Sequence, residues 1–241
     1  MPYLEYPKSD LKRNDFLNQC SNTTEKDKEL GVIYLPELVV SELLRLKPEF
    51  NLLFEKLKTS LSDKEKEVRE KNQSVDILHV YVRDFWVVAK RRAIRLDQPA
   101  EVFTKLGLPL SGDIPNLNNE KEILAAATHI VKGDASLVAN SYPAMENPSA
   151  AEVEEKLLVA QKERDDIAPA DRSYNIFQKE VSSMRIPVDT LIKDIADHLQ
   201  FALRKETESN QRRIMRTYGF EYRYLKGEPE AEVESEVVEN E

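Results

Sequence analysis

Cysteine is almost absent from the sequence. Cys20 is the only one, so no disulfide can form within the chain. A lone cysteine in a polar stretch, with no histidine motif beside it, indicates an ordinary thiol in a reducing compartment. The N-terminal residues lack the basic and apolar regions of a secretory signal, and no apolar run approaches the ~18 residues of a membrane-spanning helix. We therefore expect a cytoplasmic protein with no membrane segment.

Glycine is also scarce, with six residues in 241. So few glycines argue against turn-rich β architectures and against dinucleotide-binding folds. The sequence contains no Gly-x-Ser-x-Gly nucleophile motif, no papain-like cysteine context and no phosphate-binding glycine loop. We expect no catalytic residue and no bound cofactor.

Histidine is limited to His79, His129 and His198. Helical bundles that bind two metal ions use Glu-x-x-His pairs on two helices. Here Asp76 precedes His79 by three residues and Asp194 precedes His198 by four, so neither histidine has that motif. We expect no metal site.

Long amphipathic patterns are what the sequence does contain. From Leu35 to Val68, apolar residues recur every three or four positions, which predicts one helix with coiled-coil-like spacing. Pro48 predicts a bend near Lys47 or a split there. A second pattern predicts a helix over about Val75–Leu96. The two apolar stripes consist of Leu35, Val39, Leu43, Leu46, Phe50, Leu53, Leu57 and Leu61, and of Val75, Leu78, Val82, Phe85, Ala89 and Ala93.

Prolines and glycines interrupt the pattern over residues 97–147, which predicts a crossover with short helices, one of them ended by Gly133. A third helix is expected after Ser149, interrupted at Pro169, and a fourth runs from Pro187 to about Arg216. The fold class is therefore all-α. We expect an elongated antiparallel four-helix bundle of two helical hairpins joined by the crossover.

The domain boundaries follow from composition. Residues 1–30 are polar and are expected to form a loosely ordered arm, with one short helix near Asp10–Cys20. Residues 31–226 are expected to form the bundle. Residues 227–241 are rich in glutamate and poor in aromatic residues, which predicts a disordered acidic tail.

Two basic clusters stand out although the net charge is −9. In the expected bundle both lie near helix C-termini that point the same way, so one end becomes basic and suits phosphates or an acidic partner. Complementation of the helix dipoles is the plainer interpretation, and we prefer it. The clusters are represented by Arg91, Arg92 and Arg95, and by Arg212, Arg213 and Arg216.

An aromatic segment follows the second cluster. Its alternation of aromatic and charged residues predicts a strand, and its candidate contact residues are Tyr218, Phe220, Tyr222 and Tyr224. The strand either pairs with the short β-like run Val32–Tyr34 or docks on another subunit.

These features favour a non-catalytic structural, assembly or adaptor protein that contacts other protein subunits and forms a homo-oligomer. A nucleic-acid-associated protein that uses the basic end is the alternative, and an enzyme or metalloprotein with a site in the bundle core is the second alternative.

Overall fold

The structure is a computed structural model, and it describes residues 2–224 of the chain. Within these residues the fold is mostly helical, which confirms the all-α class, with six helices and two short strands. In chain order the elements are β1 (Tyr3–Glu5), α1 (Asp10–Glu29), α2 (Glu37–Arg95), α3 (Glu101–Lys105), α4 (Glu120–Ala139), α5 (Ala150–Ala202), α6 (Glu208–Thr217) and β2 (Glu221–Arg223).

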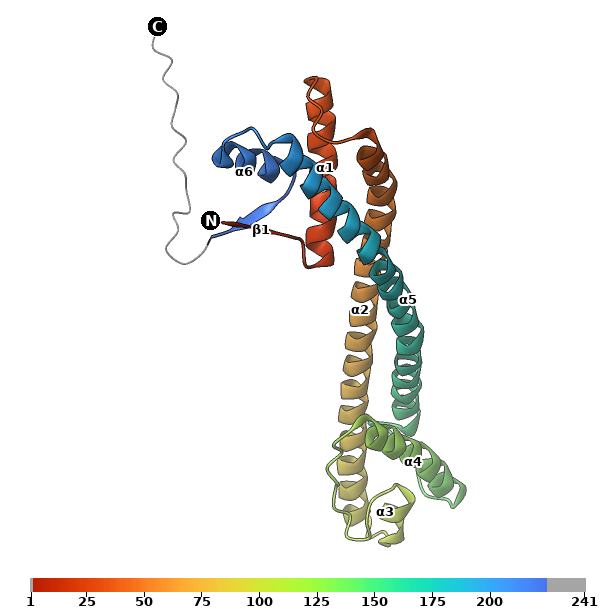
Figure 1. The fold of residues 1–241 in the computed structure, drawn as a ribbon. Coiled ribbons are helices and arrows are strands. Elements are labelled where there is room, and N and C mark those ends of the chain that lie inside the picture. The colour runs from red at the N-terminus through yellow and green to blue at the C-terminus, as the bar shows by residue number, and fades with distance from the viewer. Residues whose placement is uncertain (1, 225–241) are drawn as a thin grey trace. The chain divides into compact units, whose positions relative to one another are not determined.

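The expected four long helices are two continuous ones (Figure 1). Helix α2 has 59 residues and passes through Pro48. Helix α5 has 53 residues and contains both Pro169 and Pro187. A proline within a helix leaves one carbonyl without its N–H donor, but Pro48 and Pro169 are exposed, so water can replace that donor. The four-helix bundle is therefore not confirmed. The predicted interruption at Pro169 and a split at Pro48 are wrong, because both helices are continuous there, and the bend near Lys47 stays a prediction.

The chain divides into two compact units. Unit 1 consists of Met1–Thr59 and Asn175–Glu241, and unit 2 consists of Ser60–Tyr174. Both α2 and α5 contribute residues to each unit, so the division lies inside the long helices and not at the boundaries expected from composition. Composition marks changes of charge, whereas the units follow the clustering of apolar side chains. The expected tail, residues 227–241, lies outside the described residues.

Unit 1 has a core to which α1, α2, α5 and α6 all contribute. The residues expected to be a loose arm instead form helix α1, whose N-cap Ser9 accepts a hydrogen bond from the Lys12 backbone N–H. Phe16, Leu17 and Cys20 of this helix are buried in the core. The polar composition of residues 1–30 did not predict a buried helix, because these three apolar residues occupy only one narrow face of it.

Two bidentate ion pairs join α1 to α5 in unit 1. The Arg13 guanidinium donates to both carboxylate oxygens of Asp189 at 2.7 and 2.9 Å. Arg185 donates to both oxygens of Asp10 at 2.8 and 2.6 Å. The pKa of each arginine is raised, chiefly by these hydrogen bonds to its carboxylate partner. Bidentate geometry makes these pairs stronger than single-contact ion pairs.

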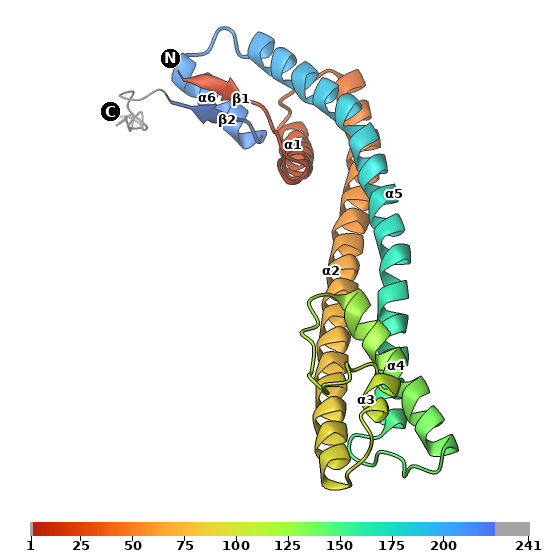
Figure 2. The same cartoon turned by 90° about the horizontal axis from the view of Figure 1, so that it is seen from below.

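The predicted C-terminal strand is present, but its partner is a different segment. Strand β2 pairs antiparallel with β1, with Leu4 opposite Tyr222 (Figure 2). The run Val32–Tyr34 does not pair with it, because those residues connect α1 to α2. The Phe220 ring packs edge-on against Phe16, with ring centroids 4.7 Å apart.

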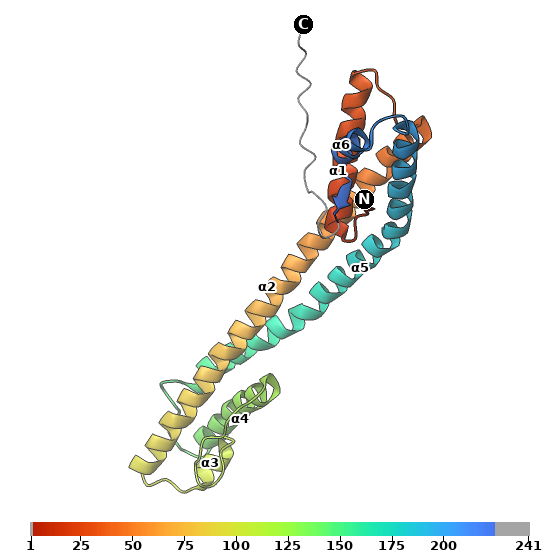
Figure 3. The same ribbon diagram turned by 60° about the vertical axis from the view of Figure 1, so that its left-hand side comes forward.

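Unit 2 has its own core of residues from α2, α3, α4 and α5. Helices α3 and α4 pack together (Figure 3), and Trp86 Nε1 donates to the Leu106 carbonyl at 2.9 Å. Gly133 was expected to end a helix, but it lies inside α4. A Cβ atom there would lie 2.1 Å from the Lys105 carbonyl oxygen. Gly133 therefore serves close helix packing and not helix termination.

The two cores leave parts of the long helices without buried residues. Neither residues 61–73 of α2 nor residues 161–180 of α5 include a buried side chain. Exposed ion pairs occur there instead, such as Lys64 with Asp171 at 2.8 Å. Among residues 2–224, no helix is apolar over a length that would cross a bilayer.

Candidate functional site

An apolar cavity lies in unit 1, where the chain passes from α1 to α2. Its volume is about 270 Å³. Both helices, the connection between them and Tyr218 contribute to its wall. The lining residues are Thr24, Asp27, Lys28, Val32, Ile33, Tyr34, Leu35, Glu37, Val40 and Tyr218.

Local backbone geometry explains why the connection forms a wall. Gly31 follows α1 with φ of +73°, a left-handed conformation that glycine adopts without strain. The Gly31 N–H donates to the Lys28 carbonyl at 3.1 Å and the Val32 N–H to the Asp27 carbonyl at 2.8 Å. These two bonds form a Schellman motif, which ends the helix and reverses the chain. The reversal places Val32, Ile33 and Tyr34 beside the end of α1.

Tyr218 and Asp27 form the polar part of the cavity wall. Tyr218 is buried, and its hydroxyl donates to the Asp27 carboxylate. Burial, followed by this hydrogen bond, raises the pKa of Tyr218 well above its usual value of 10.0. The phenol therefore stays neutral at physiological pH, and the bond fixes the Asp27 side chain at the cavity.

Three apolar side chains in and next to the connection between α1 and α2 are exposed, and Ile33 is the one that lines the cavity. Leu30, Ile33 and Leu38 are 77%, 82% and 81% exposed. Single exposed apolar residues are common, but an exposed isoleucine in the wall of an apolar cavity indicates an interaction site. Glu37 and Asp27 add negative charge to the lining, and Lys28 adds one positive charge. The cavity therefore suits an apolar or aromatic side chain that has a cation beside it.

The aromatic residues predicted as partner contacts have other positions in the structure. Tyr218 and Phe220 are buried by their own chain, 1% and 2% exposed, and their contact with a partner stays a prediction. Tyr222 and Tyr224 are half-buried. The Tyr222 hydroxyl donates to the Met215 sulfur at 3.0 Å, and Arg216 donates to the Tyr224 hydroxyl.

The basic clusters lie in different units, so neither unit assembles the expected basic end. Arg91, Arg92 and Arg95 lie in the last turns of α2 in unit 2, where Arg92 donates to the carbonyls of Pro143 and Ala144 at 2.8 and 2.9 Å. The cluster Arg212, Arg213 and Arg216 lies in α6 of unit 1, where Arg212 pairs with Glu208 at 3.3 Å. The expected alignment required four separate helices, which the chain does not form.

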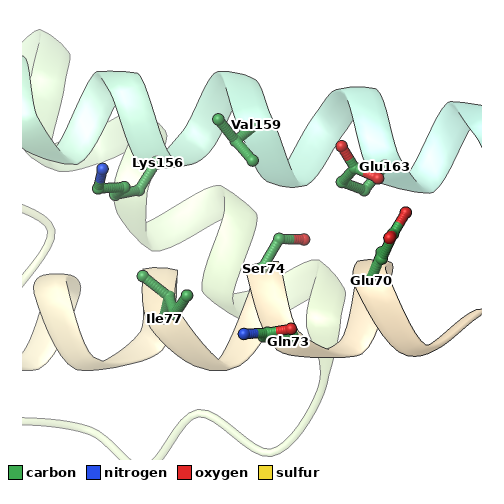
Figure 4. Close-up of a pocket in the computed structure, with 7 residues that line it drawn as sticks. All are labelled: Glu70, Gln73, Ser74, Ile77, Lys156, Val159 and Glu163. Atoms are coloured by element: carbon green, nitrogen blue, oxygen red, sulfur yellow. The ribbon is translucent and has the colours of Figure 1, made fainter. Parts of the chain in front are cut away.

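A second cavity, an open groove of about 440 Å³, lies between α2 and α5 in unit 2, and Figure 4 shows the side chains that line it. Glu70 and Glu163 lie at one end of it, and Ile77 and Lys156 lie at the other. Its lining residues are Glu70, Gln73, Ser74, Ile77, Lys156, Val159 and Glu163.

Three carboxylates meet next to this groove. One oxygen each from Glu67, Glu163 and Asp166 lies within 4.8 Å of the others. Such oxygens suit a hard cation, but the Lys162 ammonium already lies 3.0 Å from Asp166 and 3.2 Å from Glu163. The lysine supplies the positive charge that three close carboxylates require. Sequence reasoning did not find this cluster because its members lie on two helices, far apart in the chain.

Comparison with protein-family models, with curated proteins and with solved structures found no match. Any functional conclusion therefore depends on the geometry of these sites.

Proposed function

We propose that the protein is a non-catalytic structural, assembly or adaptor protein that acts through contacts with other protein subunits, including copies of itself. The apolar cavity of unit 1, with Ile33 exposed in its wall, carries this proposal. The chemistry of the cavity is that of an anchor pocket, which excludes water from a bulky side chain of the partner.

The energetics of such a contact support the proposal. Complete burial of one leucine or isoleucine side chain contributes roughly 1.5–3 kcal/mol. Leu30, Ile33 and Leu38 retain most of their surface in the single chain. A partner that covers Ile33 therefore gains roughly 1.5–3 kcal/mol at the cavity wall, in addition to the side chain that enters the cavity.

We place the protein in the cytoplasm as part of the same proposal. The observation that supports this location is the state of the lone cysteine. Cys20 is buried, and burial raises the pKa of its thiol to about 12. A buried, protonated thiol is inert, so Cys20 is a packing residue of the kind that reducing compartments retain.

Site-specific photo-crosslinking tests the proposed function. A photoreactive amino acid replaces Ile33 at the cavity, and in a control variant it replaces Leu52, another residue of unit 1 that is 57% exposed. After irradiation in the cells that make the protein, position 33 should give discrete protein adducts that position 52 does not. Equal or absent adducts at both positions, together with a strict monomer over a wide concentration range, would contradict the proposal.

A further inference from the structure

Phe201 is the exposed aromatic residue that unit 1 leaves unexplained. It lies next to the last residue of α5, Ala202, and is 66% exposed. Among residues 2–224, every other phenylalanine is buried or half-buried. An exposed phenyl ring forgoes the burial that makes aromatic residues the main anchors of cores and interfaces.

A cation accompanies this ring. The Arg204 guanidinium carbon lies 4.0 Å from the centroid of the Phe201 ring, and Arg204 Nη1 donates to the Phe201 carbonyl at 3.3 Å. Lys205 follows directly in the sequence and is exposed. The end of α5 therefore presents an aromatic knob with positive charge beside it, and we call residues Phe201, Arg204 and Lys205 the knob.

The cavity of unit 1 has the complementary chemistry. Its volume of about 270 Å³ exceeds the roughly 150 Å³ of an engineered apolar cavity that binds benzene. Val32, Leu35 and Val40 supply apolar wall, and Asp27 and Glu37 supply negative charge. A phenyl ring fits this space, and the guanidinium beside it would meet the carboxylates.

We infer that Phe201 of one copy inserts into the cavity of a second copy, with Arg204 facing Glu37 and Asp27. Phe201 is not among the residues that line the cavity of its own chain, so a Phe201 ring that enters this cavity belongs to another copy. This inference rests on the proposed function and names the partner. Knob and cavity are different surfaces, so each contact leaves one knob and one cavity open unless the two copies exchange both.

Complementary variants test this contact. Phe201→Ala removes the knob and keeps the cavity, whereas Ile33→Asp places a charge at the cavity and keeps the knob. Both positions are exposed, so both variants should fold, which circular dichroism checks. Each variant alone should associate at least about tenfold more weakly than the parent in sedimentation equilibrium.

An equimolar mixture of the two variants provides the decisive measurement. The intact knob of Ile33→Asp can enter the intact cavity of Phe201→Ala, so the mixture should form one-to-one complexes and nothing larger. Only folded chains can complement each other in this way. Absence of complexes in the mixture, or parent-like association of Phe201→Ala alone, would overturn the inference.

A charge exchange tests the orientation. Arg204→Glu should weaken association, and Arg204→Glu combined with Glu37→Arg should restore it in part, because the exchanged charges attract again. No recovery in the double variant would overturn the assigned orientation.

Crosslinking separates this inference from the proposed function. The photoreactive residue at position 33 should join the peptide that contains Phe201 of another copy. If it joins a different protein and never that peptide, the inference is overturned while the proposed function is supported.

Discussion

Helices α2 and α5 each contain two kinds of stretch, and their comparison shows what turns an apolar stripe into a core. In unit 1, α1 and α6 pack against the long helices, and in unit 2, α3 and α4 do so. The apolar stripe residues of the long helices are buried in these two cores. Over residues 61–73 and 161–180 no side chain is buried. Two helices alone cannot enclose a side chain, so burial requires elements that cover the pair.

The free energy of folding is distributed accordingly. In the covered stretches, residues such as Phe50 and Leu78 are fully buried, and each contributes roughly 1.5–3 kcal/mol. In the uncovered stretches, ion pairs such as Lys64 with Asp171 are partly exposed, and pairs of this kind are worth about 0–1 kcal/mol. Most of the folding free energy therefore comes from the stretches of α2 and α5 that other helices cover.

The largest expected effect compares the same substitution in both kinds of stretch. Leu78→Ala should lower the free energy of unfolding by about 3 kcal/mol, because Leu78 is fully buried in unit 2. Leu61→Ala, on the same helix at a residue 39% exposed, should cost less than about 1 kcal/mol. Urea denaturation followed by circular dichroism measures both. Equal losses would contradict the difference between the two kinds of stretch, since they would show that the uncovered stretch is packed as tightly as the core.

A second substitution tests the contact between α3 and α4, the helices that cover α2 and α5 in unit 2. Gly133→Ala should destabilise the protein by about 2 kcal/mol, because the new Cβ would lie 2.1 Å from the Lys105 carbonyl oxygen. Overpacking costs about 1–3 kcal/mol or more, against a gain of up to about 1 kcal/mol in helix propensity. Thermal denaturation measures the change.

Gly31→Ala is the matched control, because nothing lies within 4 Å of a Cβ built there. Its positive φ alone should cost about 1 kcal/mol. If Gly133→Ala proved neutral or stabilising, α3 and α4 would not be held together by close approach at that glycine.

The smallest effect concerns the covered part of unit 1 at alkaline pH. Burial raises the pKa of Cys20 from 9.0 to about 12, so folding favours the protonated thiol. That contribution is complete below pH 9 and is lost as the pH rises toward 12, with a loss of about 1.4 kcal/mol at pH 10. Urea denaturation at pH 8 and pH 10 measures it. In Cys20→Ala most of this pH dependence should disappear, and an unchanged dependence would assign it to other groups.

Much of the fold follows from periodicity. The stripe from Leu35 to Phe50 and the stripe from Val75 to Ala93 are buried as predicted. The same periodicity continues to Leu61, which is exposed. Local spacing shows which side of a helix is apolar, but only tertiary structure shows whether another element covers that side. For a similar reason the helices continue through Pro48 and Pro169, since exposed positions tolerate the lost hydrogen bond.

The candidate site was predictable only in fragments. Tyr218 was singled out from its aromatic segment, but as a surface contact and not as a cavity wall. The cavity joins residues 24–40 to position 218, and no spacing rule connects segments so far apart. The sequence around Phe201 does not indicate a contact site, because aromatic residues are common near helix ends. Its exposure, which gives it significance, is a property of the folded chain.

The uncovered stretches make the protein sensitive to ionic strength in two opposite ways. Mobile ions screen exposed charge pairs between the two helices, such as Lys64 of α2 with Asp171 of α5, since the Debye length falls to about 8 Å at physiological salt. Excluded salts such as sulfate strengthen apolar burial at the same time. Rising salt therefore loosens α2 from α5 where charges join them and tightens the stretches where apolar layers do. The solution, as much as the sequence, sets how firmly different parts of one helix are held.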